Sequence, residues 1–77
     1  MITVRFYGTL RLKTETPGMD VEASTVREAL KAVAAEGKVP EKELKECIAL
    51  LRGVRVSARK RLSDGDELML LSPVGGG

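Results

Sequence analysis

The side chains that usually perform enzymatic chemistry are scarce in this sequence. It contains no histidine and a single cysteine, Cys47. Ser-His-Asp and Cys-His catalytic arrangements are therefore excluded, and so are the imidazole or thiolate clusters that bind zinc or iron. Cys47 has apolar neighbours at an expected strand start, which favours a small core residue over a sulfur nucleophile. We expect no side-chain catalysis from this chain alone.

Two carboxylates, those of Asp64 and Asp66, are the nearest approach to a metal-binding pair. They flank Gly65, and an Asp-Gly pair is a common turn signal. Two carboxylates without further oxygen ligands do not make a calcium or magnesium site. The sequence therefore predicts a turn here and no metal site.

The remaining reactive group is the α-carboxylate of Gly77, at the end of the stretch SPVGGG. The six residues of this stretch extend roughly 20 Å at about 3.3–3.6 Å per residue. Glycine lets the backbone enter a passage too narrow for any Cβ, so the carboxylate could react inside a partner's active site. The alternative is a frayed chain end, which is common. The glycines follow immediately after a strong predicted strand and SPV, without a polar taper, which favours a reaching arm.

A small α+β fold has to position this arm. Apolar and polar residues alternate over 2–7, which predicts a strand with one buried face. The stretch 8–18 ends in a Pro-Gly turn signal, and we expect an irregular loop there. A second strand is predicted near residues 19–23.

The clearest helix signal is a capping box over residues 25–28. The hydroxyl of Thr25 is expected to accept from a first-turn amide, while Glu28 reaches back to the N–H of Thr25 itself. Apolar residues then recur on one face until Gly37, which predicts a helix over 25–36. Pro40 and the helix formers after it predict a short second helix that adds little to the core.

The rest of the chain predicts strands. The segments CIALL and VRVS are expected to form two strands, or one bent ribbon, around a tight turn at 52–53, and a last strand follows near 67–71. A sheet of four or five strands with one main helix packed across one face gives an α+β two-layer domain.

The C-terminal segment LSDGDELMLLSPVGGG resembles the signature of the ubiquitin-like sulfur carriers, and most closely that of the small subunit of molybdopterin synthase. These chains end in an acidic turn, a hydrophobic strand, Pro-Val and Gly-Gly. The segments MITVRFYGTLR, STVREALKAV and LLRGVRV agree with the family, so the resemblance covers nearly the whole chain. The departures are Arg52-Gly53, where asparagine is common, and a third glycine, Gly75. The resemblance implies a mixed-sheet, ubiquitin-like β-grasp domain over 1–74 and a flexible glycine tail over 75–77.

The resemblance also implies a mechanism. An E1-like adenylating enzyme uses ATP to activate the carboxylate of Gly77, and a persulfide donor converts it to a thiocarboxylate. Gly75, Gly76 and Gly77 then enter the active site of the large synthase subunit, where sulfur passes to a pterin precursor of the molybdenum or tungsten cofactor. The carrier itself binds no cofactor.

Two other functions stay open. One is a ubiquitin-like protein modifier, or a sulfur carrier for thiamine synthesis or tRNA thiolation, because the same activated terminus serves these pathways. The length and the SPVGGG end favour the molybdopterin pathway. The other is an interaction domain with a disordered tail.

A carrier needs a docking surface. If Leu68 and Leu70 point into the core, alternation turns Met69 and Leu71 outward, and it turns Tyr7 outward on the first strand. These two strands are neighbours in ubiquitin-like folds, so the three outward side chains are expected to form an apolar partner site. Pro73 and Val74 are expected to be the hinge at which order ends.

The charge pattern is less informative. The net charge is only +2. The sequence also contains a cluster of basic residues, which forms either a solvated face or a contact for an acidic partner or an anionic substrate. Its members are Arg52, Arg55, Arg59, Lys60 and Arg61. No aromatic residue lies among them for base stacking, so we expect neither nucleic acid nor membrane as a partner.

No secretory or membrane-spanning pattern is present, which predicts a cytoplasmic protein. The absence of Asn and Gln, with many Lys, Arg and Glu residues, predicts a thermophilic source.

Overall fold

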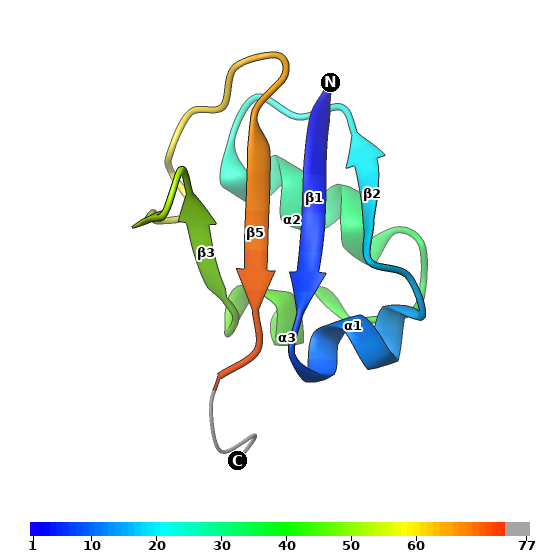
Figure 1. The fold of residues 1–77 in the computed structure, drawn as a ribbon. Helices are drawn as coiled ribbons and strands as arrows, with labels where there is room; N and C mark the ends of the chain where they lie inside the picture. Colours follow the sequence, from blue (N-terminus) through cyan, green and yellow to red (C-terminus); the bar gives the residue numbers. More distant parts are fainter. Residues whose placement is uncertain (74–77) are drawn as a thin grey trace.

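The computed structural model describes residues 1–73, and Figure 1 shows their fold. The chain forms a five-stranded mixed sheet in the order β2-β1-β5-β3-β4. The elements are β1 (Ile2–Tyr7), α1 (Thr9–Thr14), β2 (Gly18–Val21), α2 (Val26–Ala34), α3 (Glu41–Lys45), β3 (Ile48–Leu51), β4 (Val54–Arg55) and β5 (Glu67–Leu71). β1 and β5 are parallel, and the other neighbouring strands are antiparallel. This is the α+β sheet expected from the alternating pattern.

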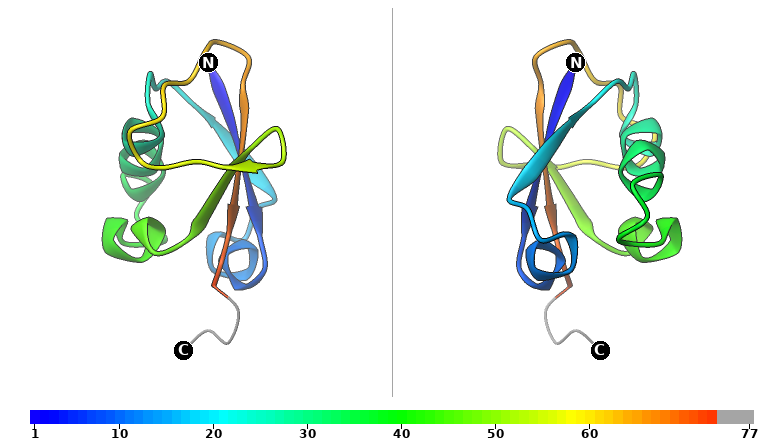
Figure 2. Two further views of the ribbon diagram at one scale, coloured as in Figure 1. Left: turned by 90° about the vertical axis from the view of Figure 1, so that its left-hand side faces the viewer. Right: turned by 90° about the vertical axis from the view of Figure 1, so that its right-hand side faces the viewer.

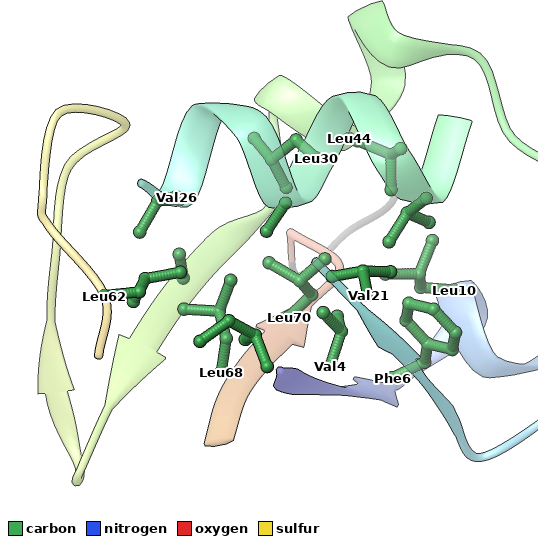
Figure 3. Packing of buried hydrophobic residues seen from close by; sticks show 14 of the residues in the cluster. Val4, Phe6, Leu10, Val21, Val26, Leu30, Leu44, Leu62, Leu68 and Leu70 are labelled. Atoms are coloured by element: carbon green, nitrogen blue, oxygen red, sulfur yellow. The ribbon is translucent and has the colours of Figure 1, made fainter. Parts of the chain in front are cut away.

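The helices α2 and α3 lie on one side of the sheet, as the side views in Figure 2 show. The core fills the space between them and the inward faces of the strands (Figure 3). Fully buried members from the sheet include Ile2, Val4, Leu68 and Leu70. We call the opposite side of the sheet, which no described helix covers, the open face.

The main helix α2 begins at a cap that differs from the expected one. The hydroxyl of Thr25 accepts from the N–H of Glu28 at 3.2 Å, as predicted. The carboxylate of Glu28, however, accepts from the N–H of Ser24 at 2.7 Å and not from that of Thr25. The first two amides of the helix, those of Val26 and Arg27, donate to carbonyls of the loop after β4 at 3.0 and 2.9 Å. A loop distant in sequence therefore completes the cap.

The stretch 8–18 was predicted to be an irregular loop, and this prediction is wrong because Thr9–Thr14 forms α1. Leu10 and Thr14 lie one turn apart, and both are buried. The hydroxyl of Thr14 donates to the carbonyl of Leu10 at 3.0 Å. An isolated helix this short is marginal in water, so the burial of Leu10 stabilises it.

The short helix α3 contributes more to the core than predicted. Leu44 is completely buried, and Val39, just before the helix, is 2% exposed. These two positions have few apolar neighbours in the sequence, so no periodic pattern marked them. The turn between β3 and β4 agrees with prediction: Arg52 and Gly53 have φ of 52° and 78°. Two residues with positive φ give the hairpin turn that matches the strand twist.

Candidate functional site

The last strand before the C-terminal segment, β5, lies in the middle of the sheet. β5 pairs with β1 through Tyr7 and Leu71 and with β3 through Ile48 and Leu71. The strand therefore has a neighbour on both sides up to its last residue. The predicted tail residues Gly75, Gly76 and Gly77 lie outside the described residues, as does Val74, so their roles remain predictions.

A side-chain hydrogen bond, separate from the backbone hydrogen bonds of the sheet, anchors the chain just after the end of β5. The side-chain oxygen of Ser72 accepts from the backbone N–H of Leu10 at 2.8 Å, across 62 residues of sequence. Gly8, at the N-cap of α1, has no side chain that could cap the helix. Its φ of 67° and ψ of −146° belong to a region that is essentially restricted to glycine. We call residues 71–73 the tail root, and Ser72 was not anticipated from the sequence.

A hollow of about 170 Å³ lies beside the tail root. Its lining includes Ser72, Pro73, Cys47 and the ion-paired side chains of Lys13 and Glu43. The thiol of Cys47 donates to the carbonyl of Glu43 at 3.5 Å. Burial, together with the charges of Glu43 and Glu46, raises the pKa of the Cys47 thiol. Cys47 therefore stays protonated at neutral pH and packs against the core, as the sequence predicted.

The open face carries an apolar patch that three strands build together. The register opposes Tyr7 to Leu71, Leu71 to Ile48, and Met69 to Leu50. We call Tyr7, Ile48, Leu50, Met69 and Leu71 the open-face patch. Tyr7 is 38% exposed and the other four are half-buried. The shared face of Tyr7, Met69 and Leu71 is thus as predicted, and exposed Pro73 follows it in the chain.

Two members of the open-face patch, Ile48 and Leu50, were missed. All four residues of β3 are apolar, so the sequence could not distinguish these outward-facing positions from buried Ala49 and Leu51. The sequence also did not give the strand order that sets β3 beside β5.

Ion pairs border the open-face patch. Arg5 contacts Glu67 at 3.1 Å and Arg52 contacts Asp66 at 2.9 Å. An apolar centre with a polar border is the usual anatomy of a protein interface.

The acidic turn before β5 uses its carboxylates within the fold. Asp66 accepts from the N–H of Ser63 at 2.8 Å as well as from Arg52. Asp64 accepts from the Met1 ammonium group, and this hydrogen bond lowers the pKa of Asp64 and raises that of the Met1 amino group.

Over residues 1–73 there is no group of three or more His, Cys, Asp or Glu side chains that could hold a metal ion. Within the same range, no helix is long and apolar enough to cross a membrane.

Comparison with protein families places the chain in a known family. A profile of the ThiS family matches residues 4–77, which is nearly the whole chain. A search of curated proteins finds no match.

Solved structures with the same fold extend over almost all of this chain. A chain of the complex of subunits 1 and 2 of the molybdopterin-converting factor from Helicobacter pylori is 26% identical, covers 99% of this chain and 97% of its own, and has a TM-score of 0.61. SAMP1 from Haloferax volcanii is 25% identical over 99% of this chain and 98% of its own, with a TM-score of 0.73. A chain of the BexX/CysO complex from Amycolatopsis orientalis is 24% identical, covers 100% of both chains and has a TM-score of 0.75. These similarities confirm the ubiquitin-like β-grasp fold.

Proposed function

Because the chain belongs to the ThiS family of ubiquitin-like sulfur carriers, we propose that it carries sulfur on Gly77 as the small subunit of molybdopterin synthase. The observation that carries this proposal is the extent of the family match, which runs through the glycines to residue 77. The similarity to a chain in the Helicobacter pylori complex of subunits 1 and 2 supports a large synthase subunit as the partner.

The carboxylate needs activation before it can carry sulfur, because a carboxylate is a poor electrophile. One of its oxygens attacks the α-phosphorus of ATP on an adenylating partner, and pyrophosphate leaves. The terminal sulfur of a persulfide then attacks the acyl carbon and displaces AMP. A thiol reduces the resulting acyl disulfide and leaves a thiocarboxylate on Gly77. In the large subunit, this sulfur passes to the pterin precursor.

The fold's part in this chemistry is positioning. Ser72 and the paired end of β5 fix where the tail starts, relative to the open-face patch. A partner that binds the patch therefore receives the tail from a constant point and direction. This raises the effective concentration of the carboxylate at the partner's active site.

A second function, that of a protein modifier, is supported by one observation. SAMP1 from Haloferax volcanii, a small archaeal modifier protein, is 25% identical over 99% of this chain. The same acyl-adenylate would then react with a lysine amine instead of a persulfide. A carrier for thiamine synthesis or tRNA thiolation would differ only in the final acceptor.

Mass spectrometry separates these functions. The protein is incubated with ATP, a persulfide donor and the adenylating enzyme from its own genome, and the intact mass is measured. Replacement of one oxygen by sulfur at Gly77 supports the carrier, and conversion of the pterin precursor by the loaded protein with the large subunit supports the molybdopterin role. Adducts with lysines of other proteins support the modifier. An unmodified protein would contradict both.

A matched control uses the chain's own terminus. A variant with one alanine appended after Gly77 should lose sulfur loading completely, because the reactive carboxylate is displaced. Its melting temperature should be unchanged if the tail makes no core contact. A large fall in melting temperature would contradict the role of the tail as a free arm.

A further inference from the structure

A groove between α2 and the β3–β4 ribbon has no part in the proposed sulfur chemistry. Its volume is about 600 Å³. We call it the α2–β3 groove. Apolar side chains from both walls line it, including Val26, Leu30, Ala49 and Val56. The first three are less than one-tenth exposed, so the groove has a firm aliphatic floor.

The charged side chains that line the α2–β3 groove are all basic. Arg27, Lys45 and Arg55 line it, and no acidic side chain does. Among the described residues, Arg27 and Arg55 form no ion pair, whereas Lys45 contacts Glu41 at 3.4 Å. By contrast, Arg5 on the open face and Arg52 in the β3–β4 turn are both paired with carboxylates.

The loop after β4 adds more positive charge to the same region. Its carbonyls at Ala58 and Lys60 accept from the first amides of α2, so the loop lies against the helix that forms one wall. Arg59, Lys60 and Arg61 belong to this loop and are exposed. Of the basic cluster of the sequence, Arg55 thus lines the groove, and Arg59, Lys60 and Arg61 are exposed on the loop that packs against α2.

The chemistry of the α2–β3 groove favours an acidic polypeptide over other anions. The first amides of α2 are already bound by loop carbonyls, so they do not offer donors to a free phosphate. No aromatic side chain lines the groove, so bases have no stacking platform. The aliphatic floor suits Val, Leu or Ile side chains. β4 ends the sheet on this side, so an extended segment could pair with its outer edge.

We propose that the α2–β3 groove binds an extended segment of a partner protein in which acidic and aliphatic residues alternate. The aliphatic residues contact the floor and the carboxylates contact Arg27 and Arg55. The groove lies on the helix side of the sheet, whereas the open-face patch lies on the other side. Both surfaces can therefore be occupied at once, whether or not Gly77 carries sulfur.

The test uses the full chain, labelled with ¹⁵N, and a synthetic peptide of alternating aspartate and isoleucine. Saturable shifts of the backbone amides of Leu30, Ala49 and Val56, weakened by added salt, are expected. The matched control peptide has lysine in place of aspartate and should cause no saturable shift. Absence of saturable binding by the aspartate peptide would overturn the proposal, and so would shifts confined to the open-face patch.

Charge-reversal variants test the site itself. The double variant Arg27→Glu, Arg55→Glu should weaken peptide binding about tenfold, because two favourable contacts become repulsive. The control, Lys31→Glu with Lys42→Glu, changes net charge equally at exposed positions outside the groove and should weaken binding less than twofold. Equal weakening by both would show unspecific attraction and overturn the site. Displacement of the peptide by an RNA oligonucleotide or by anionic vesicles, at lower concentration than by unlabelled peptide, would overturn the partner class.

Discussion

β5 enters the sheet and leaves it through two differently built junctions. At the entry, over residues 63–66, Asp64 contacts the Met1 ammonium group, and these two side chains are 88% and 62% exposed. At the exit, the half-buried hydroxyl of Ser72 accepts from the amide of buried Leu10, two residues after fully buried Leu70. Water and salt screen the exposed Met1–Asp64 pair more than the half-buried Ser72 hydrogen bond. The ion pair at the entry is therefore the weaker of these two contacts, although backbone hydrogen bonds at 63–66 also hold the entry. The Ser72 contact stands at the junction that leads to the proposed reactive carboxylate.

The largest expected effect comes from emptying the core behind the exit. Leu70→Ala removes a fully buried side chain and should lower the free energy of unfolding by about 2–5 kcal/mol. Urea denaturation measures this change. The matched control Leu12→Ala, at a side chain that is 76% exposed, should change stability by less than about 0.5 kcal/mol. Equal losses in the two variants would contradict the described core.

The next effect concerns the open-face patch beside the exit. Leu71→Asp places a charge among the apolar side chains of Tyr7, Ile48 and Met69. It should weaken binding to the large synthase subunit by about 2 kcal/mol or more and cost less in folding stability, since Leu71 is only half-buried. Calorimetric titration measures the affinity. Leu12→Asp is the control, and an unchanged affinity for Leu71→Asp would remove the patch from the docking surface.

A smaller effect is expected at the tail root. Ser72→Ala removes the acceptor for the Leu10 amide and should lower the free energy of unfolding by about 1 kcal/mol. Amide hydrogen exchange at Leu10 should become faster, which a general loss of packing would not confine to one residue. Ser72→Thr keeps the hydroxyl and should retain slow exchange. If exchange at Leu10 is the same in Ser72→Ala, the anchor is absent in solution.

The smallest effect is expected at the entry, and it depends on pH. The pKa of Asp64 is lowered from 3.8, so its stabilisation is present above that pH and is lost as pH falls through the folded pKa. The pKa of the Met1 amino group is raised from 8.0, so its share is present below pH 8.0 and is lost as pH rises through the folded pKa. At low salt, Asp64→Asn should therefore make the free energy of unfolding depend less on pH, both at acidic pH and above pH 8.0. If Asp64→Asn lowered the free energy of unfolding more than Ser72→Ala does, the entry contact would be the stronger of the two.

Much of the fold follows from local patterns. Alternation placed β1 and the inward-facing Leu68 and Leu70, and the capping signal placed α2, because both patterns lie within a few neighbouring residues. α1 was missed because Leu10 and Thr14 become helical only when the core buries them. Leu44 was missed for the same reason.

The candidate site divides in the same way. The SPVGGG end and the family resemblance pointed to Gly77 from the sequence alone. The hydroxyl of Ser72 had no local signal, since its partner Leu10 is 62 residues away. Ile48 and Leu50 joined the open-face patch only through the strand order.

The sequence by itself determined which face of β1 is buried, where the main helix begins and which reactive group the chain could offer. These properties depend on side-chain type and on spacings of two to four residues. Only the tertiary structure decided that Ser72 caps α1, that three strands build one open-face patch, and that the basic loop lies against α2. Each of these is a contact between segments far apart in the chain, and such contacts depend on how the whole core packs.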